Sequence, residues 1–165
     1  FRSFRVKYRA GDLQSPSARN SNTKVGDSKS PAHALRVVLS APQPLSSWSR
    51  AKCVPLAKEL GKPAFEQAAL NAKLPLAERI RAVEVQVELF DNLTAEHARK
   101  LTTSSEPELV ARVAWALARS AEAEPATKFL AELTRRDDPR VARAAWEALI
   151  SLAPGFRREI GRAHV

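Results

Sequence analysis

The sequence predicts an all-α domain, a right-handed α-solenoid of about four helix pairs, preceded by one β-strand and a flexible linker. Three observations lead to this prediction. The chain contains 5 Gly, 11 Pro and many Ala and Leu, which is typical of helices separated by proline-marked turns. The same residues return at a nearly constant interval along 31–156. Within each interval, apolar residues follow helical spacing.

The first expected element is a β-strand at residues 1–9. Apolar and basic residues alternate in FRVKYR, from Phe4 to Arg9, which is the pattern of a strand with one buried face. A lone strand cannot fold by itself, so we expect its sheet to lie upstream. Because the chain also begins with Phe1 rather than Met, we expect it to be a fragment of a longer protein. Residues 10–30 are polar and predict a flexible linker.

The repeat is carried by an arginine, a proline and a leucine. The arginine recurs at a constant interval, at Arg50, Arg81, Arg112 and Arg143. The proline and the leucine recur with it, at Pro44, Pro75, Pro107 and Pro139 and at Leu39, Leu70, Leu101 and Leu133. The resulting units lie near 31–62, 63–93, 94–124 and 125–156, followed by a basic tail at 157–165.

Each unit is expected to form two helices. The first ends near the repeated leucine, and the second begins near the proline, whose missing N–H costs nothing in the first helical turn. Apolar stripes such as Leu109, Val113 and Leu117 mark the second helices. One pair cannot bury both of its apolar faces, so we expect the pairs to stack.

This combination of period, turn proline and early arginine resembles the HEAT repeats of the armadillo-like class. In that family an acidic residue in the turn lies six positions before the basic one, as Glu106 precedes Arg112 and Asp137 precedes Arg143. The first two units depart from the pattern, with proline in the acidic position. The resemblance implies a non-catalytic scaffold that binds a protein partner or the flanking domains of its own chain.

A narrower resemblance concerns residues 1–9 together with 41–61 (APQPLSSWSRAKCVPLAKELG). They are similar to bacterial membrane-bound dehydrogenases of planctomycete type, in which a β-propeller related to sugar dehydrogenases precedes a HEAT segment and often a haem-binding cytochrome c domain. The resemblance implies that residues 1–9 are the last propeller strand, in a periplasmic or other extracytoplasmic protein. The chain contains no Cys-x-x-Cys-His, so any haem would bind outside it, and we expect no cofactor here.

The net charge of +9 suggests nucleic-acid binding, but its distribution argues against this function. Residues 1–30 carry +5 and residues 155–165 carry +2, which leaves +2 for 31–154. A nucleic-acid binder similar to HEAT-like DNA glycosylases therefore remains a minor alternative, because phosphate contacts dominate such affinity. The sequence has no apolar run of the ~18 residues that a membrane span needs.

The four repeated arginines are the candidate binding residues. Placed once per unit, Arg50, Arg81, Arg112 and Arg143 would line one face about 10 Å apart and could hold an acidic partner. The structural alternative is favoured: each arginine pairs with a turn acid, such as Glu106 or Asp137, or caps carbonyls of a neighbouring unit.

The aromatic residues and the possible metal ligands are expected to be structural. Trp115 and Trp146 occupy equivalent places and should fill the seams between units, while Trp48 is expected to cap the first unit. The three histidines lack the spacing of a metal site, and the lone Cys53 should be buried. Since no catalytic motif is present, we expect no catalytic site and no metal in this chain.

Overall fold

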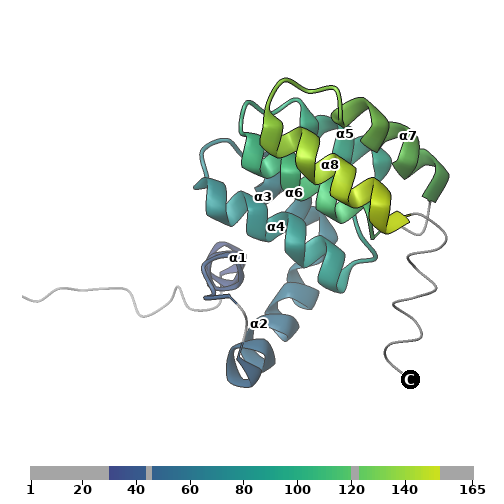
Figure 1. Cartoon of the computed structure of the whole chain (residues 1–165). Coiled ribbons are helices and arrows are strands. Elements are labelled where there is room, and N and C mark those ends of the chain that lie inside the picture. Colours follow the sequence, from purple (N-terminus) through teal and green to yellow (C-terminus); the bar gives the residue numbers. More distant parts are fainter. Residues whose placement is uncertain (1–29, 44–45, 120–122, 153–165) are drawn as a thin grey trace, which may run out of the picture.

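The computed structural model describes residues 30–43, 46–119 and 123–152 (Figure 1). Within these ranges the α-helix is the only regular secondary structure, so the prediction of an all-α domain is confirmed for them. The predicted strand at 1–9, nearly all of the linker at 10–30 and the tail at 157–165 lie outside the described residues. The helices are α1 (Pro31–Leu39), α2 (Ser47–Leu60), α3 (Lys62–Leu70), α4 (Leu76–Leu89), α5 (Ala95–Thr102), α6 (Pro107–Leu117), α7 (Ala123–Leu133) and α8 (Pro139–Leu152).

Short side chains and prolines determine where these helices begin. Ser30, Ser46 and Thr94 are N-caps whose hydroxyl oxygens accept hydrogen bonds from backbone N–H groups three residues later, so each satisfies one unpaired donor of a first turn. Pro107 and Pro139 are the first residues of α6 and α8, as expected for the repeated proline. Pro75 differs, because it is the N-cap residue of α4.

The helices pack mainly as consecutive pairs, α1 with α2, α3 with α4, α5 with α6 and α7 with α8. The second helices of the last three pairs form a layer in which α6 packs against both α4 and α8. Helices α1 and α2 lie below the other six in Figure 1, and they contact the rest mainly through α3 and α4. Residues one repeat period apart in α6 and α8 therefore occupy comparable places on neighbouring helices.

The core lies between the first and second helices. Phe65, Leu109 and Leu130 are fully buried in it, and the repeated leucines Leu101 and Leu133 are buried as well. The repeated leucine of the second unit is an exception, because Leu70 is 41% exposed at the end of α3.

Polar side chains fasten the ends of three helices to their neighbours. Arg79 Nε donates to the carbonyl of Ala69 near the end of α3 at 3.0 Å. Asn92 Nδ2 donates to the carbonyl of Ala116 in α6 at 2.7 Å. The Arg136 guanidinium donates to the carbonyl at the end of α5 at 2.5 Å. Each bond is accepted by a carbonyl in the last turn of a helix, where few or no backbone donors remain, so these contacts set how the helices sit against each other.

Candidate interaction surface

The four repeated arginines occupy different environments. Arg50 is exposed on α2, Arg81 is only 5% exposed on α4, Arg112 is half-buried on α6, and Arg143 is exposed on α8. The chain therefore does not present them as a uniform row of available cations.

Arg81 is bound by two carboxylates of its own helix. Its guanidinium lies 3.1 Å and 3.3 Å from the two Glu88 oxygens and 3.2 Å from Glu84 Oε2. The other Glu84 oxygen lies 3.4 Å from Arg112 Nε on α6. Glu84 thus joins α4 to α6. Both arginines are therefore paired with carboxylates of the chain itself.

The acids that pair with the repeated arginines are not the turn acids expected from the sequence. Within the described residues, Arg112 pairs with Glu84, and Arg143 Nε donates to Glu147 Oε1 at 2.8 Å. A carboxylate one turn further along the same helix, or on a packed neighbour, lies closer to these guanidinium groups than Glu106 or Asp137.

In the connection between α7 and α8, Asp138 forms an ion pair, whereas the sequence predicted this for its neighbour Asp137. Asp138 Oδ2 lies 3.0 Å from an Arg140 nitrogen, and Arg140 also pairs with Glu108 on α6. Hydrogen bonding to Arg140 lowers the pKa of the Asp138 carboxyl below its ordinary value. The unit-to-unit ion pair in this part of the chain therefore joins the first turns of α6 and α8.

Two guanidinium groups stack on one indole at the end of α6. The Cζ atoms of Arg112 and Arg119 lie 5.0 Å and 4.0 Å from the ring centroid of Trp115. Arg119 Nη1 also donates to the Trp115 carbonyl at 3.0 Å, which satisfies a carbonyl at the helix end. Burial, followed by the charge of Arg112, lowers the pKa of Arg119 below its ordinary value. Among the described residues, no carboxylate forms an ion pair with Arg119.

The equivalent positions of α8 are more open. Trp146 and Ile150 are each 58% exposed and lie one turn apart on the face that carries Arg143. The prediction that Trp146 fills a seam between units is therefore wrong, whereas Trp115 is half-buried. The difference arises because α6 has helices on both sides, while the second-helix neighbour of α8 within the described chain is α6 alone. We call this surface the Arg–Trp face, made of Arg112, Trp115, Arg119, Arg143, Trp146 and Ile150.

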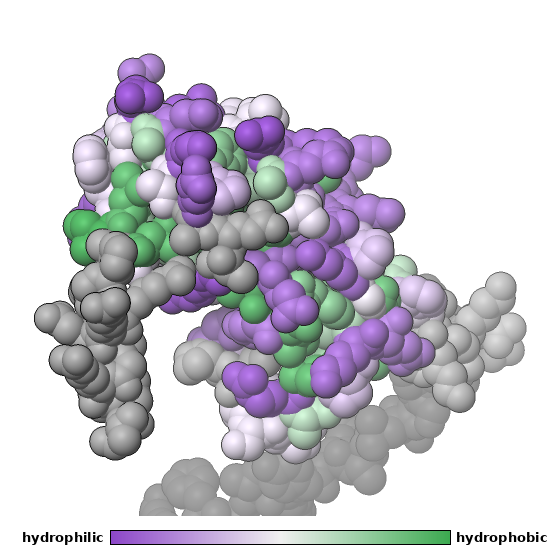
Figure 2. Space-filling model, turned by 90° about the vertical axis from the view of Figure 1, so that its right-hand side faces the viewer, coloured by the Kyte–Doolittle hydropathy of each residue, from purple (hydrophilic) through white to green (hydrophobic). Residues whose placement is uncertain are grey.

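Among the described residues, Trp48 and Leu70 are the other large hydrophobic side chains that are exposed. Trp48 on α2 is 76% exposed, with Lys52 Nζ 5.8 Å from its ring centroid. Contrary to the expectation from the sequence, it does not cover the first unit. Figure 2 shows a largely hydrophilic face, on which hydrophobic residues gather at the left edge and in the lower part. Clusters of exposed Trp and Ile on such a surface mark candidate binding sites.

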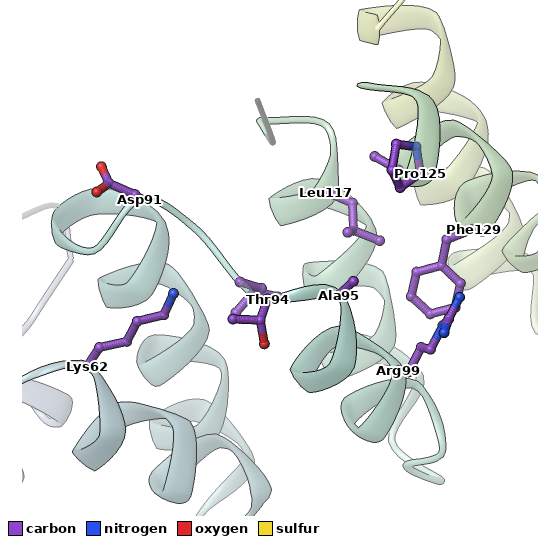
Figure 3. A pocket seen from close by; sticks show the side chains of 10 residues that line it. Lys62, Asp91, Thr94, Ala95, Arg99, Leu117, Pro125 and Phe129 are labelled. Carbon is purple, nitrogen blue, oxygen red and sulfur yellow. The ribbon is translucent and has the colours of Figure 1, made fainter. Parts of the chain in front are cut away.

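A separate pocket of about 440 Å³ lies where α5 and α7 begin (Figure 3). Leu93, Leu117 and Ala126 are buried residues of its lining, and Phe129 forms part of a wall. Arg99 lies over the Phe129 ring at 5.9 Å, and Lys62 reaches toward the pocket from the opposite side. Sequence reasoning missed this pocket because its residues come from several separate elements and share no spacing.

The described residues offer little that suggests chemistry. They contain no group of three His, Cys, Asp or Glu side chains arranged to hold a metal ion. Cys53 is free and buried, as expected. None of the described helices is long and apolar enough to cross a membrane.

No family model, curated protein or solved structure matches the chain.

Proposed function

We propose that the chain is a non-catalytic HEAT-like scaffold, a solenoid of helix pairs that holds a protein partner or the flanking domains of its own chain. The observation that carries this proposal is the side-by-side packing of the second helices α4, α6 and α8. Repeat proteins use such extended surfaces for binding. The constant interval between the repeated arginines agrees with this arrangement.

The Arg–Trp face is the surface we assign to the partner. Tryptophan and arginine are the residues that most often dominate the binding energy of protein interfaces. Trp146 and Ile150 expose apolar area to water, and burying it against a partner is favourable. The pocket between α5 and α7 is not needed for this function.

Site-specific photo-crosslinking in the source cells tests the proposal. A benzophenone amino acid replaces Trp146 in one version of the full chain and Leu70 in the control version. Leu70 is a matched control because it is also an exposed apolar residue, but lies on α3. We expect the same protein, or the same flanking domain, to be crosslinked reproducibly from position 146 and not from position 70. Equal crosslinking from both positions, or none from 146, would contradict the proposal.

Nucleic-acid binding is the alternative favoured by one specific observation, the exposed Trp146 next to arginines, since indoles can stack on bases. Two of the arginines on the face already pair with Glu84 and Glu147, which argues for a protein partner instead. Fluorescence anisotropy with labelled DNA at two salt concentrations separates the two. Tight binding that falls steeply with salt would favour nucleic acid.

The resemblance to propeller-type dehydrogenases stays a prediction, because residues 1–9 lie outside the described part of the chain. The gene sequence on both sides tests it. Propeller-like strands upstream and a Cys-x-x-Cys-His downstream would make the chain the internal scaffold of an extracytoplasmic redox protein. The flanking domains would then be the partners of the Arg–Trp face.

A further inference from the structure

The Arg–Trp face has an unbalanced cluster of guanidinium groups at its α4–α6 side. Among the described residues, Arg81 and Arg112 pair with two carboxylates, Glu84 and Glu88, and both of these carboxylates bind Arg81. Within the same residues, Arg119 has no carboxylate partner. Arg112 and Arg119 share the Trp115 ring, and burial, followed by repulsion from Arg112, lowers the pKa of Arg119. A carboxylate brought to this place would relieve the repulsion.

The guanidinium group of Arg119 is also held in position before any partner arrives. It stacks on Trp115 at 4.0 Å, and it is tied by a 3.0 Å hydrogen bond to the carbonyl of the same residue. Side chains that are already ordered lose little entropy on binding. A guanidinium fork can hold a carboxylate through two parallel hydrogen bonds, which neutral donors match poorly.

The α8 side of the face is different in character. Trp146 and Ile150 lie one turn apart, and each exposes 58% of its surface. The nearby Arg143 is already paired with Glu147, so this side offers mainly apolar area. Because α6 and α8 pack side by side, the cationic side and the apolar side are adjacent. One bound segment can therefore reach both.

We infer that the Arg–Trp face binds an acidic segment of its partner, with Asp or Glu placed at Arg112 and Arg119 and bulky apolar side chains placed on Trp146 and Ile150. This inference rests on the proposed scaffold function and specifies the chemistry of the partner. Opposite charge selects the segment and sets its orientation, while the apolar contacts supply area.

Fluorescence anisotropy with two labelled helical peptides tests this inference on the full chain. The first peptide carries Glu and Leu at i, i+3, i+4 and i+7 positions of one face, and the second has Gln in place of every Glu. We expect the Glu peptide to bind at least about tenfold more tightly than the Gln peptide, the effect of roughly one well-formed charged contact. Equal affinities for the two peptides would overturn the inference.

Variants of the chain show where the peptide binds. Arg119→Gln is expected to remove most of the preference for the Glu peptide over the Gln peptide, and Trp146→Ser to weaken the binding of both peptides. Arg135→Gln is the matched control, because it removes one exposed positive charge outside the face and is expected to change neither affinity. If Arg135→Gln weakens binding as much as Arg119→Gln, the attraction is non-specific and the inference fails.

Arg119→Lys keeps the charge and guards against misfolding of the Gln variant. It is expected to remain folded and to lose severalfold affinity for the Glu peptide alone, because an ammonium group cannot form the fork. Failure of the inference is distinguishable from failure of the scaffold function. Loss of the acid preference with crosslinking from position 146 retained removes only the acidic partner, whereas absence of crosslinking removes the function itself.

Discussion

At the scale of single residues, His97 is a polar side chain in a place that the two neighbouring units fill with phenylalanine. Phe65 occupies the equivalent position of the preceding unit, and Phe129 occupies that of the following unit. His97 is 5% exposed on α5, and its Nε2 atom is buried without a hydrogen-bond partner. The charged groups near it are Glu66 and Lys62 on α3 and Lys100 on α5. A group in this position should make stability depend on pH.

The first prediction is that the chain loses stability as the pH falls below 6.5. Burial lowers the pKa of His97 below its ordinary value of 6.5, an effect that Lys62 and Lys100 reinforce and Glu66 opposes. As the pH falls, the unfolded chain therefore binds the proton before the folded chain does. The free energy of unfolding decreases from about pH 6.5 downward, until the pH passes the folded-state pKa of His97. Urea unfolding at pH 7.5 and pH 5.5 measures the difference.

His97→Phe isolates this effect. It removes the titrating group and the unpaired Nε2, so we expect a gain of about 1 kcal/mol at neutral pH and a larger gain at pH 5.5. His33→Gln is the control, because His33 is exposed on α1. An unchanged pH dependence in His97→Phe would show that another group is responsible.

The second prediction concerns Asn92, which has a φ of 80° between α4 and α5. Its side chain is buried and donates to the Ala116 carbonyl of α6 at 2.7 Å. Asn92→Gly keeps the backbone unstrained but loses this bond, which should cost about 1–2 kcal/mol. Asn92→Ala should cost roughly 1–2 kcal/mol more, because alanine disfavours the left-handed conformation. Thermal unfolding of the two variants measures both costs, and equal stability of Gly and Ala would argue against strain.

The sequence could predict which residues lie close together on the same helix. It could not predict which residues of different helices contact each other. The repeat period marked Arg112, Trp115 and their counterparts on α8 as equivalent. Nothing in the spacing pointed to Glu84 as the acid beside Arg112, because the two come from different units. Arg119 was missed although it follows Trp115 by one helical turn, a spacing that puts two side chains in contact.

At the scale of elements, Glu84 is the link between α4 and α6. Its side chain is 18% exposed and lies between Arg81 and Arg112. The third prediction is that Glu84 and Arg112 are coupled. A double-mutant cycle with Glu84→Gln and Arg112→Gln should give a coupling of about 0.5–1 kcal/mol, because partial burial limits screening by water.

The exposed pair Lys128–Glu124 on α7 provides the comparison for that cycle. Its side chains are 75% and 83% exposed, so the corresponding coupling should be no more than a few tenths of a kcal/mol. Chemical denaturation in urea at low salt measures both cycles. Coupling at Glu84–Arg112 that is no larger than at Lys128–Glu124 would contradict a linking role for Glu84.

The helices themselves could be predicted because their signals are local. Caps, turn prolines and apolar spacing lie within a few residues of each helix end, as at Thr94 and Pro107. The exposure of Trp146 could not be predicted in the same way, because the sequence treats it like Trp115. Only the position of α8 relative to its neighbours separates the two residues.

At the scale of the whole molecule, the helix pairs are unequally supported. Helix α6 packs against α4, α5, α7 and α8, whereas α1 and α2 contact mainly each other, α3 and α4. Helices with fewer packed neighbours open most easily, because less burial is lost when they separate from the rest. The side-by-side layer of α4, α6 and α8 should therefore be the part that opens last.

The fourth prediction is that native-state hydrogen exchange follows this order. We expect amides of α6 to exchange only through global unfolding, and amides of α1 and α2 to exchange through a local opening of lower free energy. Cys53 on α2 gives a second readout, because it is a free, buried thiol that becomes reactive when α2 opens. Its rate of alkylation should follow exchange in α2 rather than in α6. Uniform protection of all the described helices would instead show that they unfold as one cooperative unit.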